Sequence, residues 1–178
     1  TPGPMELLKK HIRSIPDFPK EGIIFRDITT LLKEGEVFHQ AVQALCDPYR
    51  GEDVDHVVAM EARGFILGGA MACELGTGFV PIRKSGKLPA ETIEKTYELE
   101  YGTDTLAMHR DAIQPGERIL MFDDLLATGG TMAASCEMVE ELEGDIIACA
   151  FLIELDPLEG RKKISRYDIL SLIHYDTA

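Results

Sequence analysis

The clearest pattern along the chain is an apolar run, residues 119–122, that predicts a strand buried on both faces. Two carboxylates, Asp123 and Asp124, follow it directly, and a small glycine-rich turn comes next. Beyond the turn, apolar residues recur at steps of three and four, which predicts an amphipathic helix capped by Thr128 or Thr131. The pattern therefore indicates a strand, a tight turn and a helix N-terminus, with acids where the strand ends.

The same plan occurs once more, earlier in the chain. Residues 57–60 predict a short buried strand, the charged turn Glu61-Ala62-Arg63-Gly64 follows, and residues 65–75 predict an apolar helix. In an open parallel sheet, both turns would lie outside the carboxyl ends of the strands, where ligands bind. We therefore expect the two turns to form one site.

The remaining apolar segments predict further elements of the same sheet. Strands are expected at residues 78–82, 146–155 and 169–173, and helices near 5–15 and 37–45. Alternation on each side of Gly102 predicts a hairpin held above the sheet. The sequence thus predicts an α/β fold with a mainly parallel sheet of about five strands and flanking helices, in one domain over 1–178 that starts with a flexible lead at 1–4.

Composition narrows the function classes. The net charge of -13 argues against a nucleic-acid partner or an anionic membrane surface. The longest apolar stretch, residues 64–73, is about half of what a bilayer crossing needs, and no signal-peptide pattern opens the chain. The four cysteines lack the spacing of a zinc site, and three fall in apolar runs. These features predict a soluble, cytoplasmic protein.

The turn after residue 124 has its own chemistry. Gly129 and Gly130 allow a tight turn with exposed amides, the helix start leaves N–H groups unpaired, and two threonines add hydroxyls. Such a turn binds a phosphate monoester. Asp123 and Asp124 would repel that phosphate, so we expect them to face vicinal hydroxyls, with or without a divalent metal. The implied ligand is a ribose 5-phosphate.

Cations near the two turns have two interpretations each. In its position, Arg63 is most often exposed or paired with Glu61, yet its planar fork could hold a second anion. The basic run at residues 83–89 is of a kind that usually forms a solvated surface. Beside two phosphate-binding turns in so acidic a chain, we interpret it as a pyrophosphate clamp.

Residues 123–131, Asp-Asp-Leu-Leu-Ala-Thr-Gly-Gly-Thr, resemble the phosphoribosyl-pyrophosphate signature of the type I phosphoribosyltransferases, in the form found in members that act on adenine. The resemblance implies that Asp123 and Asp124 hold the ribose hydroxyls. It implies a 5-phosphate site formed by Ala127, Thr128, Gly129, Gly130 and Thr131. It also implies the fold of that family, with a small hood and a mobile loop.

Two further segments are similar to the same family. Residues 16–33 match its purine-pocket segment, which implies that Phe25 stacks on the base while the backbone at Ile24 and Arg26 reads its edge. Residues 83–111 match its mobile lid, including Leu-Glu-Tyr-Gly at 99–102. Within that motif, Tyr101 would contact substrate and Glu100 would exchange a proton with the ring. From pattern alone, Glu100 could equally be an exposed hairpin acid.

The diphosphate contacts are also implied by the resemblance. Arg63, with the backbone on either side of it, would bind the pyrophosphate, and Arg83 and Lys87 would help to disperse its charge. The resemblance further implies a strained peptide around Glu61 and Ala62, for which a cis bond is one form.

The resemblance covers nearly the whole chain and implies a complete reaction. Adenine and phosphoribosyl pyrophosphate, with Mg²⁺ held mainly through the substrate, would give AMP and pyrophosphate in purine salvage, on a homodimer. Two alternatives remain open: a transferase for another base, and a non-catalytic sensor of phosphoribosyl pyrophosphate. Such a sensor would need a DNA-binding extension and a basic face, for which this chain has neither the length nor the charge.

Overall fold

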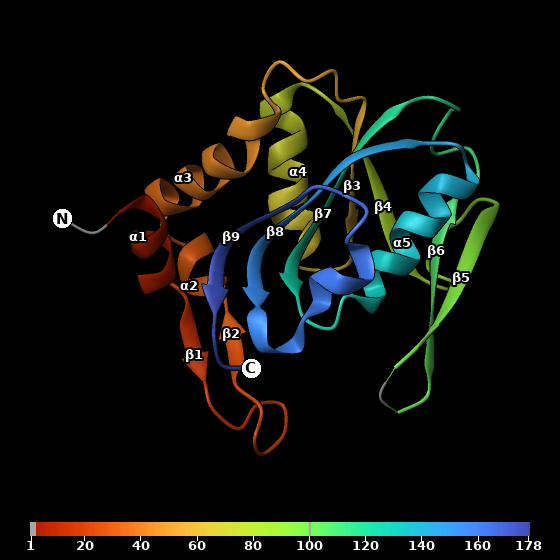
Figure 1. Ribbon diagram of the computed structural model, residues 1–178. Helices are drawn as coiled ribbons and strands as arrows, with labels where there is room; N and C mark the ends of the chain where they lie inside the picture. Colours follow the sequence, from red (N-terminus) through yellow and green to blue (C-terminus); the bar gives the residue numbers. More distant parts are fainter. Residues whose placement is uncertain (1–2, 100) are drawn as a thin grey trace.

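The computed structural model describes residues 3–99 and 101–178, and within them one twisted sheet organises the molecule (Figure 1). In the described residues this sheet has seven strands in the order β5-β6-β4-β3-β7-β8-β9. Neighbours from β4 to β9 run parallel, and β5 and β6 are antiparallel. The strands are β3 (His56–Met60), β4 (Gly78–Lys84), β5 (Thr92–Glu98), β6 (Thr103–His109), β7 (Arg118–Leu126), β8 (Asp145–Leu155) and β9 (Ile169–Tyr175).

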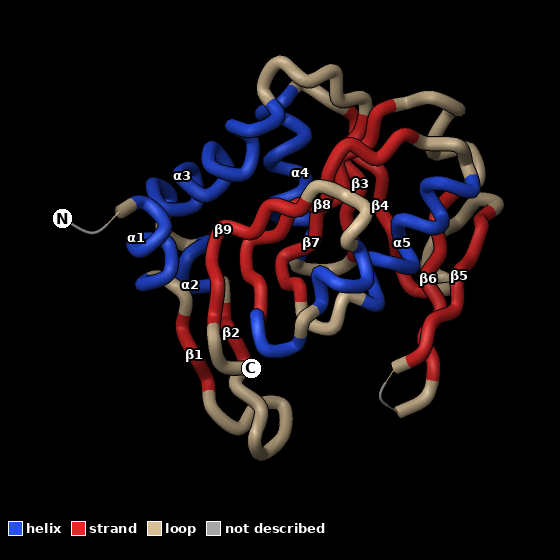
Figure 2. The backbone as a smooth tube through the Cα atoms, in the orientation of Figure 1, coloured by secondary structure: helices blue, strands red, loops and turns tan. Residues whose placement is uncertain are grey.

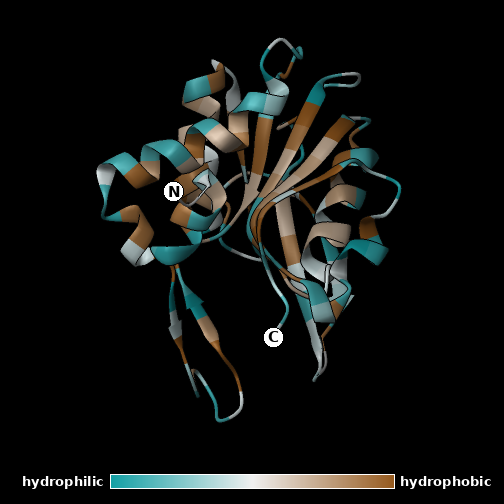
Figure 3. Ribbon diagram, turned by 60° about the vertical axis from the view of Figure 1, so that its left-hand side comes forward, coloured by the Kyte–Doolittle hydropathy of each residue, from teal (hydrophilic) through white to brown (hydrophobic). Residues whose placement is uncertain are grey.

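Helices cover both faces of the sheet, as predicted. On β7, Leu120 and Phe122 pack toward the helices α1 (Pro4–Lys10), α2 (Thr29–Leu32), α3 (Gly35–Cys46) and α4 (Gly64–Leu75). Ile119 and Met121 point the other way, toward α5 (Gly130–Glu141). Successive strand residues face opposite sides, so a continuous apolar run is what a strand covered on both faces requires. In Figure 3, brown stretches along the central strands mark hydrophobic residues.

The hairpin β5–β6 belongs to the sheet, so the prediction that it is held above the sheet was wrong. Strand β6 pairs with the end of β4, where Arg83 lies opposite Ala107. The alternation that predicted a hairpin also gives it one apolar face, and Ile93, Leu106 and Met108 bury that face in the core beside α5. The five parallel strands therefore match the prediction, and the hairpin accounts for the two additional strands within the described residues.

A smaller sheet stands apart from the main one. Within the described residues it pairs β1 (Arg13–Ile15) with β2 (Phe25–Asp27) in antiparallel register. Pro4 begins α1, with Gly3 as its N-cap, and residues 1–2 of the predicted flexible lead lie outside the described residues. Figures 1 and 2 place the small sheet and the tip of the β5–β6 hairpin on opposite sides of the carboxyl ends of the central strands. Any ligand at that edge would lie between them.

Two further predictions from the sequence concerned the cysteines, three of which fall in apolar runs, and the length of the longest apolar stretch. Cys46, Cys136 and Cys149 are buried core residues and Cys73 is exposed, and all of them are free thiols in the described structure. No described helix combines the length and the apolar character that a bilayer crossing needs.

Candidate active site

Three adjoining hollows follow the carboxyl edge of the sheet. The hood cavity, of about 370 Å³, lies between the small sheet and the ends of β7 and β8. The central cavity, also about 370 Å³, lies at the turn after β3, and the loop cavity, about 70 Å³, lies at the turn after β7. Arg63, Asp124 and Leu125 line both the hood and the central cavity. Asp123, Ala127 and Thr131 line both the central and the loop cavity, so the three form one continuous groove.

The hood cavity is mainly apolar and suits a flat ring. Phe25 forms one wall, braced by Phe18 in an edge-on contact with ring centres 5.2 Å apart. Ile24 and Arg26 line the same cavity. Across from the small sheet, the apolar lining comes from Leu125, Ile153, Leu155 and Leu158.

The side chain of Arg26 is directed toward the C-terminal segment. Its guanidinium donates to the Thr177 carbonyl at 3.1 Å and to the Thr177 hydroxyl at 2.9 Å, and it lies 3.9 Å from the ring centre of Tyr175. A second branch donates to Ser14 at 2.6 Å. These contacts engage the side chain of Arg26, and a role of its backbone in binding a base edge stays a prediction.

Arg63 connects the hood cavity to the central cavity. Its Nε lies 3.1 Å from Oδ2 of Asp124, and its guanidinium carbon lies 4.9 Å from the ring centre of Phe25. The side chain of Asp124 is almost fully buried, so this ion pair is only weakly screened by water. Arg63 therefore places a positive charge where the two cavities meet.

Asp123 places a second carboxyl, next to Asp124, in the central cavity. Among the described residues no cation lies within ion-pair distance of it, and its Oδ1 accepts the Asp124 amide at 2.8 Å. Burial, followed by repulsion from Asp124, raises the pKa of the Asp123 carboxyl well above its ordinary value. Such a carboxyl gains from a ligand that donates hydroxyl protons or brings a cation.

The turn after β3 contains a cis peptide between Glu61 and Ala62, as the resemblance implied. Glu61 accepts the Lys84 amide at 2.6 Å and pairs with Lys87 at 3.0 Å and with Arg83 at 3.6 Å. Burial alone would raise the pKa of Glu61, but the Lys84 amide and the Lys87 ammonium outweigh it and lower the pKa. Arg83 and Lys87 thus both pair with Glu61, which lines the central cavity.

The turn after β7 is built without a side-chain cap, so the expected capping by Thr128 or Thr131 was wrong. Gly129 is the N-cap of α5 and adopts a left-handed conformation with φ +86°. Glycine reaches this conformation without steric cost, and the first amides of the helix remain free. Neither threonine hydroxyl is used as a cap, and a helix N-terminus is a favourable place for an anion.

Several lining residues were not singled out from the sequence. The Tyr97 hydroxyl lies 3.1 Å from the Thr131 hydroxyl, so the β5–β6 hairpin reaches the turn after β7. Lys84 pairs with Asp104 at 2.9 Å, and both line the central cavity. Leu125 touches all three cavities because β7 continues past the acidic pair. Alternation along β7 could have indicated Leu125, whereas the hairpin residues are placed by tertiary packing.

Most of the predicted site residues come together along the groove. Tyr101 does not: it is 86% exposed at the hairpin tip. Glu100 lies outside the described residues. The predicted residues that line the groove are Ile24, Phe25, Arg26, Arg63, Asp123, Asp124, Ala127, Thr128, Gly129 and Thr131, and Gly130 is the first residue of α5.

Comparisons with known proteins identify similar chains. The model of a family called phosphoribosyl transferase domain matches residues 30–176. The adenine phosphoribosyltransferase of Halothermothrix orenii is 57% identical over 166 residues, which cover 93% of this chain and 98% of that protein. The crystal structure of adenine phosphoribosyltransferase from Thermoanaerobacter pseudethanolicus has 52% identity and a TM-score of 0.93, covering 96% of this chain and 99% of its own. The Saccharomyces cerevisiae enzyme, solved with an imino-altritol bisphosphate and adenine, has 38% identity and a TM-score of 0.90, covering 95% and 98%.

Proposed function

This chain belongs to the phosphoribosyltransferase family, and we propose that it transfers the 5-phosphoribosyl group of phosphoribosyl pyrophosphate to adenine, giving AMP and pyrophosphate in purine salvage. The observation that carries the proposal is the order of the groove. An apolar cavity for a flat base, a carboxylate-lined cavity and a helix N-terminus adjoin one another in the order base, ribose, phosphate. A ribonucleoside 5-phosphate has its parts in the same order.

The base would be held in the hood cavity. Phe25 offers an aromatic face on one side and Leu125 an apolar wall that reaches into the ribose region. The backbone at Ile24 and Arg26 would pair with the edge of adenine, whose exocyclic amine needs an acceptor and whose ring nitrogens need donors. The yeast relative was solved with adenine, which supports this base for the present chain.

Ribose and pyrophosphate would occupy the central cavity. Asp123 and Asp124 accept the two ribose hydroxyls, and the pyrophosphate lies toward Arg63, with Arg83 and Lys87 nearby. The reacting carbon loses pyrophosphate through an oxocarbenium-like state, so stabilising the leaving charge is the main catalytic requirement. A fixed guanidinium aimed at that charge contributes more in a partly buried site than it would in water.

The residues also fit a magnesium ion. Two adjacent carboxylates, one of them without a cation partner in the described structure, form an oxygen-rich cavity of the kind that binds Mg²⁺ together with substrate phosphates. When bound, Mg²⁺ neutralises charge on the pyrophosphate. We propose that it is held mainly through the substrate.

The 5-phosphate would anchor the substrate in the loop cavity. Free amides at the start of α5 and the hydroxyls of Thr128 and Thr131 supply the donors, and Ala127, Gly129 and Gly130 shape the turn. Binding energy from this non-reacting group then fixes the reacting carbon in place.

We further propose the larger-scale properties that the family resemblance implies. The chain forms a single domain in which residues 16–33 supply the purine pocket and residues 83–111 act as a mobile lid, and it works as a homodimer in the cytoplasm. The free thiols in the described structure fit a reducing compartment. Sedimentation with and without substrates would test the dimer, and hydrogen exchange over residues 83–111 would test closure of the lid.

The reaction itself is tested by pyrophosphate release. Phosphoribosyl pyrophosphate and Mg²⁺ are supplied with adenine, hypoxanthine, guanine or orotate in separate assays. We expect release with adenine. Release only with another base would keep the groove and overturn the base assignment. Binding of phosphoribosyl pyrophosphate without release for any base would favour a non-catalytic sensor.

We expect Glu100→Gln to lower turnover by about 100-fold, which is the usual contribution of acid–base help, while affinity for phosphoribosyl pyrophosphate stays nearly unchanged. The substitution should affect only the transfer of the proton from the adenine ring, because the incoming nitrogen is already nucleophilic. Glu98→Gln is the matched control, since Glu98 is an exposed acid of the same hairpin. Normal turnover in Glu100→Gln would remove this residue from the mechanism.

A further inference from the structure

The segment between β8 and β9 lies against the turn at residues 127–129, the phosphate turn of the proposed function, through backbone atoms. It consists of the short 3-10 helices η2 (Asp156–Leu158) and η3 (Gly160–Ile164). A Cβ added to Gly160 would lie 2.3 Å from the carbonyl oxygen of Ala127. A Cβ added to Gly129 would lie 2.3 Å from the carbonyl oxygen of Gly160. The two backbones are therefore packed so closely that neither glycine can carry a side chain unless a backbone moves.

An ion pair between a buried carboxylate and the partly exposed Arg161 holds the residue next to Gly160. Glu154, at the end of β8, is 3% exposed and accepts both branches of the Arg161 guanidinium, at 2.9 and 2.7 Å. Ser171 on β9 donates to the same carboxylate at 2.7 Å. A bidentate pair with an additional hydrogen bond holds a planar guanidinium in one orientation. Since Arg161 directly follows Gly160, the pair also holds the glycine against the phosphate turn.

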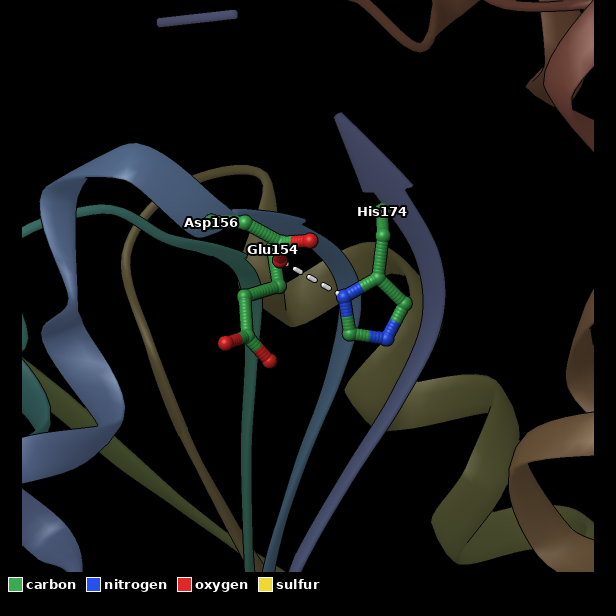
Figure 4. A group of neighbouring side chains, drawn as sticks. All are labelled: Glu154, Asp156 and His174. Carbon is green, nitrogen blue, oxygen red and sulfur yellow. Dashed lines mark hydrogen bonds and ion pairs between the residues drawn. The ribbon is translucent and has the colours of Figure 1, made fainter. Parts of the chain in front are cut away.

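The same carboxylate belongs to a cluster that resembles a cation site. One ligand atom each from Glu154, Asp156 and His174 lies within 4.8 Å of the others (Figure 4). However, Glu154 is already engaged by Arg161, and His174 Nδ1 lies 2.7 Å from Asp156. The dashed contact in Figure 4 joins only His174 and Asp156. We therefore interpret the cluster as structural. The contact between His174 and Asp156 connects β9 to η2, and the ion pair between Glu154 and Arg161 connects β8 to η3.

We propose that Gly160, held by the Glu154–Arg161 pair, is a positioning element that sets the backbone of the turn at 127–129 for the 5-phosphate. This inference rests on the proposed function, because it assigns the phosphate to that turn. Gly160 touches no part of the substrate and acts through Ala127 and Gly129. Its contribution is to keep the amide donors of the turn at phosphate-binding geometry before the ligand arrives.

Gly160→Ala tests the contact directly. Unlike Gly129, Gly160 lies outside the left-handed region, so alanine adds a steric clash there and no backbone strain of that kind. We expect the dissociation constant for ribose 5-phosphate, measured by calorimetry without any reaction, to rise between about 10-fold and 100-fold. The KM for phosphoribosyl pyrophosphate should rise in parallel, while the KM for adenine and kcat at saturation change less than about 2-fold.

Gly144→Ala is the matched control. Its Cβ would lie 2.7 Å from Val139 Cγ1 and 3.2 Å from the Val139 carbonyl oxygen, so it introduces a steric clash, mainly with a side chain, just after the far end of α5 and away from the groove. This variant should lose thermal stability and keep the affinity for ribose 5-phosphate. A purely structural role for Gly160 would produce the same behaviour in Gly160→Ala, namely a lower Tm with unchanged affinity, and that result would overturn the proposal.

Arg161 provides a second test in case Gly160→Ala does not fold. Arg161→Met should weaken ribose 5-phosphate binding, and Arg161→Lys should restore only part of it, because an ammonium cannot make the bidentate pair with Glu154. Unchanged binding in both variants would overturn the inference while leaving the proposed function in place. Failure of the unsubstituted protein to bind ribose 5-phosphate would overturn both.

Discussion

Replacing Asp123 and Asp124 together by asparagine is expected to weaken the binding of phosphoribosyl pyrophosphate by about 100-fold, since each carboxylate gives up a charge-assisted hydrogen bond to a ribose hydroxyl. The two residues lie side by side in the central cavity, and an amide keeps their shape while removing their charge. The loss should therefore reflect the charge and not a change in packing. Calorimetric titration with phosphoribosyl pyrophosphate and Mg²⁺ measures it.

The two single substitutions should differ in their effect on stability. Burial and the neighbouring Asp124 raise the pKa of Asp123, so the folded state holds this proton more tightly than the unfolded state does. Its contribution to the free energy of unfolding is therefore favourable at low pH and is lost as pH rises through the raised pKa. At pH 7 to 8, Asp123→Asn should raise Tm, by about 2–4 °C for each kcal/mol of repulsion removed. Asp124→Asn removes the same repulsion but leaves Arg63 without its partner, so its Tm should lie below that of Asp123→Asn.

Two controls test whether the changes in binding and in Tm are specific to Asp123 and Asp124 or follow from removing any carboxylate. Asp111→Asn removes an exposed carboxylate and should change neither binding nor Tm. The Tm gain of Asp123→Asn should shrink toward pH 4, where the unfolded carboxyl also becomes protonated. Unaltered binding of phosphoribosyl pyrophosphate in the double variant would refute the ribose assignment.

The local parts of the site could be predicted because contiguous residues encode them. The apolar run, the acidic pair and the glycine turn follow one another within β7 and the start of α5, so hydrophobic pattern and turn chemistry were sufficient. The helix cap was predicted wrongly for a related reason. A threonine cap is the commoner solution, but a turn that offers its amides to a ligand uses Gly129 in a left-handed conformation.

The long-range parts could not be predicted in this way. Tyr97 reaches Thr131, 34 positions later in the chain, only because β6 joins β4 and brings the hairpin over α5. The contact of Gly160 with Ala127 likewise depends on how β8 and β9 pack. Alternation shows that a strand has an apolar face and leaves open which surface covers it. The apolar face of β5–β6 is covered by the core beside α5. The prediction had instead placed this hairpin above the sheet.

Arg63→Ala is expected to lower kcat/KM by between about 100-fold and 1,000-fold, the range typical for removing one group that stabilises developing charge. The structure adds a reason for the large effect. Arg63 lines both the hood and the central cavity, pairs with Asp124 at 3.1 Å and lies 4.9 Å from the ring centre of Phe25. Its loss would remove the cation that we propose to face the pyrophosphate, and it would leave the buried Asp124 carboxylate unpaired.

Arg63→Lys distinguishes charge from geometry. A lysine keeps the positive charge but lacks the planar group that can contact Asp124, the aromatic ring and the leaving group together. We expect Arg63→Lys to recover part of the kcat that Arg63→Ala loses. The KM for adenine should stay raised, because the contact between the guanidinium and the Phe25 ring is lost. Arg110→Ala is the matched control, since Arg110 pairs with Glu91 on the exposed surface. Steady-state kinetics with both substrates varied gives all three parameters. A variant Arg63→Ala with normal kcat/KM would place the leaving charge elsewhere, most directly on Arg83 and Lys87 after their release from Glu61.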